Sequence, residues 1–420
     1  MFLLPCAEGT FLVDGVCPHR GGPLHLGRVD AAAGAVECPW HGRLVSLRKL
    51  VRDAYPMVVR DDIAAAVLPG TGDDDVELQC RVVHPTNATK RDETGRKESV
   101  TMTAERAKNE ETGGKYAPGI EEFIDRCNRA MPPDFYLRPV EEQRRMYLGL
   151  TVEFPYEVPA GVSIVDDAVA HGGRSLRLRV YRPERPAGRG AILYIRGGGF
   201  VVGSLDTHHT VVAELAAKSG LTAVALDFRM APEHPFPAAV EDCYGALSGV
   251  IAEARRFGID PDKVVIAGDS SGANQAVVVS MMARDRGGPR IAGQALISPV
   301  LDFTRWRSGG ADAPLLTGGE MEYYTRCYVA DPNGVGQPYV SPLVSGAFHG
   351  LPPAYIMGAE MDSLLVDSRE YAERLRAHGT PVELVVEPGL VHSAVRARGL
   401  CPQVADAWAR FCARAARLAS

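Results

Sequence analysis

The segment G-D-S-S-G, residues 268–272, has the composition of a tight turn that exposes a nucleophile. It follows the apolar run KVVIAG and precedes the helix-like run ANQAVVVSMMARD, so a strand, a sharp turn and a helix are predicted around Ser270. Small residues must flank the serine because the turn is strained and the hydroxyl has to project from the top of a sheet. The five-residue pattern is weak by itself, and its value depends on what the rest of the chain supplies.

Two later strand-like segments end in residues that could activate Ser270. Asp362 follows PAYIMGAE, and His392 follows VELVVEP. An imidazole that is oriented by a carboxylate can take the proton of a serine hydroxyl, and Ser, Asp, His is one of the chain orders in which this acyl-transfer chemistry occurs. The neighbouring Glu360 and Asp367 compete with Asp362 for the carboxylate role.

A glycine-rich loop stands upstream of these residues. The apolar run AILYIR leads into Gly197, Gly198 and Gly199, where no side chains obstruct the backbone N–H groups. Such a loop can bind the oxyanion that forms when a serine attacks a carbonyl group. The adjacent His208 and His209 do not indicate a metal site, because consecutive helical residues point in different directions, and we interpret them as ordinary helix residues.

A second set of reactive residues lies near the start of the chain. Cys17 and His19 form a C-x-H pattern, and after eighteen intervening residues Cys38 and His41 form C-x-x-H. Proline and glycine flank both patterns and restrict the backbone. Two thiolates and two imidazoles could hold an iron–sulfur cluster, and zinc could use the same four ligands.

Composition bounds the kind of protein that carries these residues. A chain of 420 residues with 46% hydrophobic and 23% charged residues has apolar material for two or three folded units. The net charge of −6 is spread without a basic block, which argues against nucleic acid or an anionic membrane as partner. The opening residues lack the features of a signal peptide, and no run approaches the ~18 apolar residues of a spanning helix. Nine irregularly spaced cysteines do not indicate a disulfide framework, so we expect a cytoplasmic protein.

The texture of the sequence predicts three regions. Residues 1–83 contain short alternating runs such as TFLVDGV and YPMVVRDDIAAAVL, which indicate a small all-β domain. Residues 84–115 are polar and charged and are predicted to be a linker, with one short helix at TAERAKNEE. Residues 116–420 begin with amphipathic helical patterns and continue with apolar strands that alternate with helices. This alternation predicts a mostly parallel central sheet with helices on both faces.

The first two loops resemble those of a known cofactor-binding family. CPHRGGPL and CPWHG are similar to the cluster-binding loops of Rieske [2Fe–2S] proteins, in which one iron is held by two Cys and the other by two His. The resemblance implies that Cys17 and Cys38 hold one iron and that His19 and His41 hold the other.

The N-terminal region departs from that family in three places. Gly22 and Trp40 stand where respiratory-chain Rieske proteins have an additional disulfide, and Arg43 stands where they often have a serine that donates to the cluster. Fewer donors predict a low, ferredoxin-like potential. Only sixteen residues precede Cys17, so the domain is predicted to be trimmed at its N-terminal side.

The rest of the chain resembles the hormone-sensitive-lipase family of α/β-hydrolases, which are carboxylic ester hydrolases. The resemblance is carried by RGGGF, DFRMAPEHPFPAAVED, GDSSG, the stretch from PYVSPL to GAEMD, and the late histidine, and it covers residues 116–420. It implies a helical cap over an acyl pocket, formed by about 116–150 and part of 303–339.

The same resemblance assigns further roles. It implies that the oxyanion is bound by the amides of Gly198, Gly199 and Ser271. Arg196 replaces a family histidine, and Ser393-Ala394 replaces Gly-Phe. Arg196 either holds the loop by hydrogen bonds or presents a charge near the oxyanion, and we favour the first role.

The function predicted from these patterns is two-step ester hydrolysis on a small-molecule ester, carried by a chain that also holds a [2Fe–2S] cluster. No H-x4-H pair for a mononuclear iron is present, which argues against a Rieske oxygenase. The cluster could regulate the esterase or serve a separate electron-transfer partner protein. The alternative is a ferredoxin-like electron carrier in which the hydrolase fold is a scaffold for that partner. The oligomeric state, a homodimer included, stays open.

Overall fold

The computed structural model describes residues 115–306 and 312–420, and in the N-terminal part it describes 2–6, 9–13, 24, 28–30, 34–37, 44–52, 54, 57–60 and 63–66. The chain divides into two compact units, Met1–Thr103 and Ala104–Ser420. The predicted linker, including the helix expected at TAERAKNEE, lies outside the described residues apart from its last residue, Lys115.

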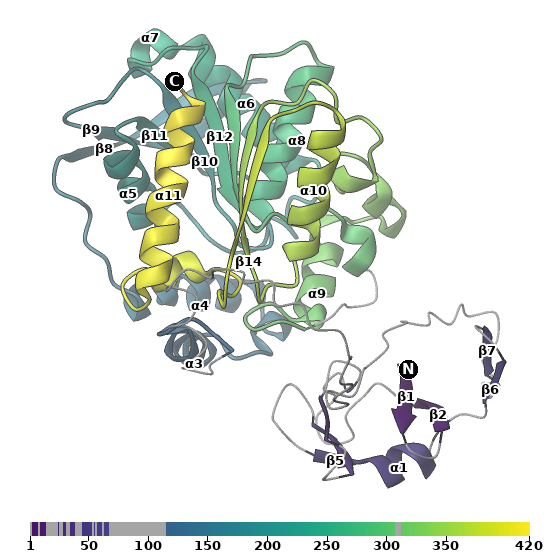
Figure 1. Ribbon diagram of the computed structural model, residues 1–420. Coiled ribbons are helices and arrows are strands. Elements are labelled where there is room, and N and C mark those ends of the chain that lie inside the picture. Colours follow the sequence, from purple (N-terminus) through teal and green to yellow (C-terminus); the bar gives the residue numbers. More distant parts are fainter. Residues whose placement is uncertain are drawn as a thin grey trace, which may run out of the picture. The chain divides into compact units, whose positions relative to one another are not determined.

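The described residues of the N-terminal unit lie mainly in short antiparallel strands (Figure 1). Its elements are β1 Phe2–Cys6, β2 Gly9–Val13, β3 Arg28–Asp30, β4 Ala35–Glu37, β5 Leu44–Ser46, α1 Leu47–Arg52, β6 Met57–Arg60 and β7 Ile63–Ala66. β2, β6 and β7 confirm the strands predicted in TFLVDGV and YPMVVRDDIAAAVL, whereas α1 was not predicted. A small apolar core joins β2, β4, β5 and α1, and its buried residues are Val13, Leu24, Val36, Val45 and Leu50.

The second unit is built on an eight-stranded sheet with the order β15-β14-β13-β12-β10-β11-β9-β8. The strands are β8 Val162–His171, β9 Arg174–Pro183, β10 Ala191–Ile195, β11 Thr222–Leu226, β12 Val264–Asp269, β13 Gly293–Ile297, β14 Ala354–Ala359 and β15 Val382–Glu387. The six strands from β10 to β15 run parallel, and the β8–β9 hairpin is antiparallel. The predicted mostly parallel sheet is therefore confirmed.

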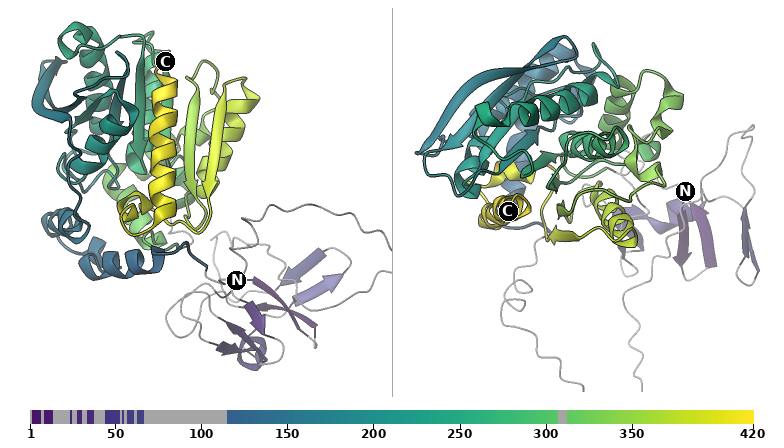
Figure 2. Two further views of the ribbon diagram at one scale, coloured as in Figure 1. Left: turned by 60° about the vertical axis from the view of Figure 1, so that its left-hand side comes forward. Right: turned by 90° about the horizontal axis from the view of Figure 1, so that it is seen from above.

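Alternation within the strands explains why helices cover both faces. In β10, Leu193 and Ile195 belong to one buried apolar cluster, while Ile192 and Tyr194 belong to the other. The inner parallel strands are buried on both sides, so their sequences are nearly continuous apolar runs, whereas the edge strand β15 is only partly buried. Helices α6 Ala238–Ala252, α8 Ser271–Asp285 and α10 Leu365–Ala377 cover one face, and α5 His209–Ser219 and α11 Pro402–Leu418 cover the other (Figure 2).

The β8–β9 hairpin was not predicted, although its sequence carries a strand pattern. Leu176, Leu178 and Val180 are buried, whereas the intervening Arg177 and Arg179 reach other charged groups. The arginines made the segment appear polar, but the period of two is that of a half-buried strand.

Three further helices lie together at one end of the sheet (Figure 1). They are α3 Ile120–Ala130, α4 Val140–Glu153 and α9 Gly318–Tyr328. Phe135 and Tyr324 from these segments pack on Val201 and Val202, just after the glycine loop. The chain segments expected to form a cap, 116–150 and part of 303–339, thus contact each other above that loop.

The remaining elements are short. They are α7 Ala254–Phe257 and the 3₁₀ helices η2 Phe135–Leu137, η3 Phe303–Trp306, η4 Pro332–Gly336, η5 Pro342–Val344 and η6 Ala394–Ala397. Of the helices in the described ranges, none combines the length and the apolar character that crossing a bilayer demands.

Candidate active site

The serine, aspartate and histidine that were expected to act together lie at the carboxyl ends of three parallel strands, and we call their hydrogen-bonded arrangement the relay. Ser270 directly follows β12, Asp362 follows the end of β14, and His392 follows the end of β15. The carboxyl ends of parallel strands meet at one edge of a sheet, where open α/β folds place their ligands. Residues 122 positions apart in the sequence therefore meet at this edge.

The structure brings these three side chains into hydrogen-bond distance. His392 Nδ1 lies 2.8 Å from Asp362 Oδ2, and His392 Nε2 lies 3.0 Å from Ser270 Oγ. The other carboxylate oxygen of Asp362 accepts from the backbone N–H of Leu364 at 2.9 Å. This contact fixes the carboxylate, which in turn fixes the orientation of the imidazole.

The electrostatics of the pair suit a general base. Burial raises the pKa of Asp362, but the charge and hydrogen bond of His392 and the Leu364 N–H outweigh it and lower that pKa below its ordinary value. Burial lowers the pKa of His392, but the Asp362 carboxylate outweighs it and raises that pKa above its ordinary value. A carboxylate that stays ionised beside a more basic imidazole is the arrangement that proton removal from Ser270 requires.

The turn around Ser270 is strained and tightly enclosed. Ser270 has φ of 52° and ψ of −118°, in a region that residues other than glycine rarely adopt. A Cβ on Gly272 would lie 2.1 Å from the carbonyl oxygen of Ile195, and one on Gly268 would lie 2.6 Å from the same oxygen. Glycine is therefore required on both sides because β10 passes directly against the turn.

The two carboxylates that competed for the third place in the relay have other partners. Glu360 accepts from the backbone N–H of Gly389 at 2.7 Å. Asp367 accepts from the backbone N–H groups of Leu301 and Asp302 at 2.6 and 3.0 Å. Glu360 thus joins the segments that follow β14 and β15, and Asp367 joins α10 to the segment that follows β13.

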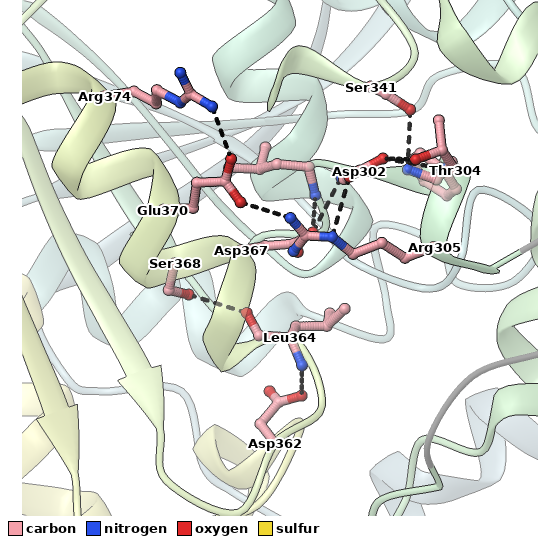
Figure 3. Close-up of polar contacts among 12 residues, drawn as sticks. Asp302, Thr304, Arg305, Ser341, Asp362, Leu364, Asp367, Ser368, Glu370 and Arg374 are labelled. Carbon is pink, nitrogen blue, oxygen red and sulfur yellow. Dashed lines mark hydrogen bonds and ion pairs between the residues drawn. The ribbon is translucent and has the colours of Figure 1, made fainter. Parts of the chain in front are cut away.

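Asp367 belongs to a charged network behind the Asp362 turn (Figure 3). Arg305 donates to Asp367 at 2.6 Å and to Glu370 at 2.5 Å, and its Nε lies 3.0 Å from Asp302. The network joins η3 to the first turns of α10. It therefore anchors the segment that begins at Asp362.

The glycine loop offers unobstructed amide groups. Gly198 and Gly199 have φ of 124° and 58°, and a Cβ on Gly198 would lie 2.2 Å from the Val202 carbonyl oxygen. Within the described ranges, the N–H groups of Gly198 and Gly199 donate to no protein acceptor. Ser271 is the first residue of α8, where helical N–H groups have no partner within the helix. Three backbone donors near the Ser270 turn thus remain available.

Asp269 holds the glycine loop from below, a role the sequence analysis missed. Its Oδ1 accepts from Tyr194 Oη at 2.7 Å and from the Gly197 N–H at 3.0 Å, and its Oδ2 lies 3.4 Å from His208 Nε2. Burial raises the pKa of Asp269, but His208 and these hydrogen bonds outweigh it and lower that pKa. The Gly197 N–H already donates to Asp269, so Gly197 fixes the position of the loop and does not offer a free donor to an oxyanion.

The interpretation of His208 and His209 as ordinary helix residues is wrong for His208. It is the residue before α5, it is buried, and its Nδ1 lies 2.9 Å from Thr207 Oγ1. His209 points elsewhere, with Nδ1 3.1 Å from Tyr181 Oη. The adjacency of the pair concealed the role of His208, because only the fold places it beside the buried carboxylate of Asp269.

Arg196 is buried within the glycine loop. Its Nη1 donates to the Val202 carbonyl at 2.9 Å, its Nη2 lies 3.1 Å from Met230 Sδ, and its guanidinium stacks on Phe228 at 4.3 Å. Burial lowers its pKa to about 10. These contacts suit the loop-holding role that the sequence analysis favoured.

The Ser393-Ala394 departure also has a structural consequence. Ser393 has φ of 59°, in the left-handed region that glycine adopts at little cost. Serine at this position bears backbone strain directly after His392. Ala394, which replaces the family phenylalanine, is buried.

The expected cluster ligands Cys17, His19, Cys38 and His41 lie outside the described residues. The described segments flank them in the sequence: β4 ends at Glu37, and β5 begins at Leu44. Within the described ranges, no group of three or more His, Cys, Asp and Glu side chains is placed to hold a metal ion. The five described cysteines from Cys127 onward are free thiols.

The fold and the serine turn define an α/β-hydrolase with a serine nucleophile elbow. Residues 192–396 match the family described as the alpha/beta hydrolase fold, and residues 5–50 match the Rieske [2Fe–2S] domain. The chain belongs to the hormone-sensitive-lipase family of α/β-hydrolase esterases, and a Rieske-type domain precedes the hydrolase in the sequence. Both resemblances seen in the sequence are thereby confirmed.

Several relatives of this chain are named as esterases. Esterase LipI of Mycobacterium tuberculosis is 36% identical over 256 residues, which cover 58% of this chain and 78% of the relative. Carboxylesterase NlhH of Mycobacterium tuberculosis is 35% identical over 271 residues, which cover 61% and 83%. The structure of a hyperthermophilic esterase from the archaeon Pyrobaculum calidifontis superposes with a TM-score of 0.66 at 31% identity, covering 73% of this chain and 99% of that one.

Proposed function

We propose that the second unit hydrolyses carboxylic esters by two-step acyl transfer, with Ser270 as nucleophile, His392 as base and Asp362 as the group that orients the base. The observation that carries the proposal is the continuous relay of 2.8 and 3.0 Å contacts from Asp362 through His392 to Ser270. The esterase names of the relatives agree with this chemistry.

Each residue has a defined part in the reaction. His392 takes the proton of Ser270 as Oγ attacks the ester carbonyl, and Asp362 stabilises the imidazolium that forms. The amides of Gly198, Gly199 and Ser271 bind the oxyanion. His392 then protonates the leaving alcohol, and the same steps with water in place of Ser270 release the acid.

The packing of α3, α4 and α9 supports the cap that the resemblance implies. Tyr324 of α9 lies against Gly199, where an added Cβ would meet its ring at 2.5 Å. In this proposal the three helices shape the pocket for the acyl or alcohol group of the substrate. The cap thus meets the oxyanion loop directly through one aromatic ring.

The test is turnover of 4-nitrophenyl acetate and butyrate by Ser270→Ala. Loss of a triad nucleophile should reduce kcat by about 10³-fold or more, with KM little changed. Ser280→Ala is the matched control: Ser280 lies in α8, the helix that follows Ser270, its hydroxyl donates to the Ala276 carbonyl, and its loss should leave near-native rates. Ser270→Ala protein that still turns over these esters at near-native rates contradicts the proposal.

A second function is favoured by the match of residues 5–50 to the Rieske domain. We propose that Cys17, His19, Cys38 and His41 hold a [2Fe–2S] cluster. The donor set fits, because two thiolates and two imidazoles satisfy the two irons of a Rieske centre. When bound, such a cluster supplies one-electron transfer. Strands β4 and β5 flank the second loop in the sequence, and Glu37 and Leu44 form a register pair of these two strands.

Metal analysis of the anaerobically purified chain tests this second function. Iron and acid-labile sulfide should each be near two per chain, and the reduced protein should give the electron paramagnetic resonance signal of a Rieske centre. Cys38→Ser should lose both. Stoichiometric zinc without iron contradicts the cluster assignment.

The link between the two functions is tested in the full chain. We propose redox regulation, so that ester turnover differs between the oxidised and the dithionite-reduced protein, bounded by about 100-fold from typical coupling free energies. Cys38→Ser should abolish the difference. Equal constants in both states would favour a bifunctional chain whose cluster serves a separate electron-transfer partner. An inactive hydrolase unit with an intact cluster would favour the electron-carrier alternative.

A further inference from the structure

Glu320 on the cap helix α9 places a carboxylate at the active site that the mechanism does not use. Thr317 caps the helix, and its Oγ1 accepts from the Glu320 N–H at 3.1 Å. The Glu320 carboxylate in turn accepts from the Thr317 backbone N–H and from the Tyr324 hydroxyl. This reciprocal pattern is a capping box, which holds the carboxylate in one position.

The Glu320 carboxylate has a further neighbour, Tyr324, that a capping box does not require. The hydroxyl of Tyr324 donates to the Glu320 carboxylate, and the ring of Tyr324 lies directly on Gly199 of the glycine loop. Glu320 is only partly buried, and among the described residues no Lys or Arg forms an ion pair with it. A capping glutamate on an exposed helix end would have water around its charge, whereas this one contacts Tyr324, whose ring packs on the glycine loop.

Among the described residues, His392 is the titratable group outside α9 whose charge influences the pKa of Glu320. The two side chains affect each other, since Glu320 contributes to raising the pKa of His392. Burial is the largest influence on Glu320 itself and raises its pKa to about 7, against the lowering effects of His392, Thr317 and Tyr324. The carboxyl group therefore changes charge within the pH range in which an esterase is assayed.

We propose that Glu320 determines substrate charge specificity: its carboxylate excludes esters with a negatively charged group on the acyl chain and favours neutral or cationic esters. This rests on the proposed esterase function of the same site. A fixed negative charge in a partly desolvated pocket repels an anionic substituent strongly, because the effective dielectric constant is lower than in water. The exclusion should be strongest above pH 7, where the carboxylate is ionised, and should weaken as the pH falls.

The experiment compares 4-nitrophenyl esters of three six-carbon acids: hexanoate, hemiadipate with a terminal carboxylate, and 6-trimethylammoniohexanoate. In the unaltered chain at pH 8, kcat/KM for the hemiadipate relative to hexanoate should be low, and it should rise as the pH is lowered through about 7. Glu320→Gln keeps the capping box, since glutamine serves as well as glutamate at this position, but removes the charge. It should raise the hemiadipate ratio about tenfold at pH 8, lower the trimethylammonio ratio, and abolish the pH dependence of both.

Glu322→Gln is the matched control on the same helix. Glu322 pairs with Arg326 at 3.2 Å on the outer side, so its removal should leave both ratios unchanged. Ratios that stay the same in an active Glu320→Gln enzyme overturn the specificity proposal and leave the esterase proposal intact. If Glu320→Gln does not fold, a hemiadipate ratio in the unaltered chain that is constant from pH 6 to 8.5 overturns it equally.

Discussion

The site contains two buried pairs of an aspartate and a histidine, and they differ in almost every property. Asp362 and His392 are 2.8 Å apart, and the second imidazole nitrogen faces the Ser270 hydroxyl. Asp269 and His208 are 3.4 Å apart, and the second imidazole nitrogen faces Thr207. The first pair is arranged for proton transfer, whereas the second is enclosed by the loop it supports.

The pKa values of the two histidines are shifted in opposite directions by their wider surroundings. Burial lowers the pKa of both. Around His392, the carboxylates of Asp362 and then Glu320 outweigh burial and raise its pKa. Around His208, the positive charges of Arg396 and Arg196 oppose Asp269, so burial prevails and the pKa stays lowered. In the proposed mechanism, the same two residue types thus serve as a base and its orienting group in one place and as structural support for the glycine loop in the other.

The largest expected difference between the pairs is in catalysis. Asp362→Asn should reduce kcat by about 10³- to 10⁴-fold, because the amide favours the wrong imidazole tautomer and cannot stabilise the imidazolium. Steady-state kinetics with 4-nitrophenyl butyrate checks this. A loss below about tenfold would mean that Asp362 does not orient the base.

Asp269→Asn should have a smaller effect on the rate and a larger effect on stability. The amide can still accept from Tyr194 or Gly197 but loses the charge that strengthens both hydrogen bonds. We expect kcat to fall by about 10- to 100-fold through misplacement of the oxyanion donors, and the free energy of unfolding to fall by about 1–3 kcal/mol. Urea unfolding and kinetics measure the two quantities. A kcat loss equal to that of Asp362→Asn would erase the distinction between the pairs.

The pH profile distinguishes the two histidines directly. In the proposed mechanism His392 acts as a base only when it is neutral, and its pKa is raised, so kcat/KM for a neutral ester should fall as the pH drops through a value above that of an ordinary histidine. His208→Gln should leave this acidic limb in place, because burial lowers the pKa of His208 while the pKa of His392 is raised, so the two imidazoles do not titrate together. A limb that moves in His208→Gln and not in Asp362→Asn would reverse the assignments.

The smallest expected effect on the rate concerns the network that anchors Asp362. Arg305→Gln leaves Asp367 buried without its guanidinium partner, and the free energy of unfolding should fall by about 1–3 kcal/mol. Turnover should change by less than about threefold, since the Asp362 contacts with His392 and Leu364 remain. Arg374→Gln, which removes only a half-exposed contact to Glu370 at 3.1 Å, is the control. A rate loss of the Asp362→Asn size would place Arg305 in the catalytic relay.

The sequence predicted the relay better than its support. Ser270, Asp362 and His392 each follow an apolar strand run, so strand order alone placed them at one edge of the sheet. His208 carries no such signal, because its partner Asp269 lies 61 positions away and only the parallel pairing of β10 with β12 brings the segments that follow these strands together. The strain at Ser393 was equally hidden, since a left-handed φ depends on the path of the chain after β15.

The N-terminal region teaches the opposite lesson. The spacing of Cys17, His19, Cys38 and His41 predicts a cluster from ligand chemistry, independent of any long-range fold. The small core around Val36 and Val45 agrees with strands that flank the second loop. Candidate metal ligands can be predicted from residue type and spacing, whereas the role of a supporting residue such as Asp269 depends on which side chains the fold packs against it.

The most direct test of the account is to locate a covalent adduct. The chain is treated with diethyl 4-nitrophenyl phosphate, which phosphorylates an activated serine and releases 4-nitrophenol, and peptide mass spectrometry then maps the adduct. We predict one diethylphosphoryl group per chain, on Ser270, with labelling largely lost in His392→Ala and retained, though slower, in Asp269→Asn. Labelling at another residue, or equal labelling of Ser270 in His392→Ala, would contradict the claim that His392 activates Ser270.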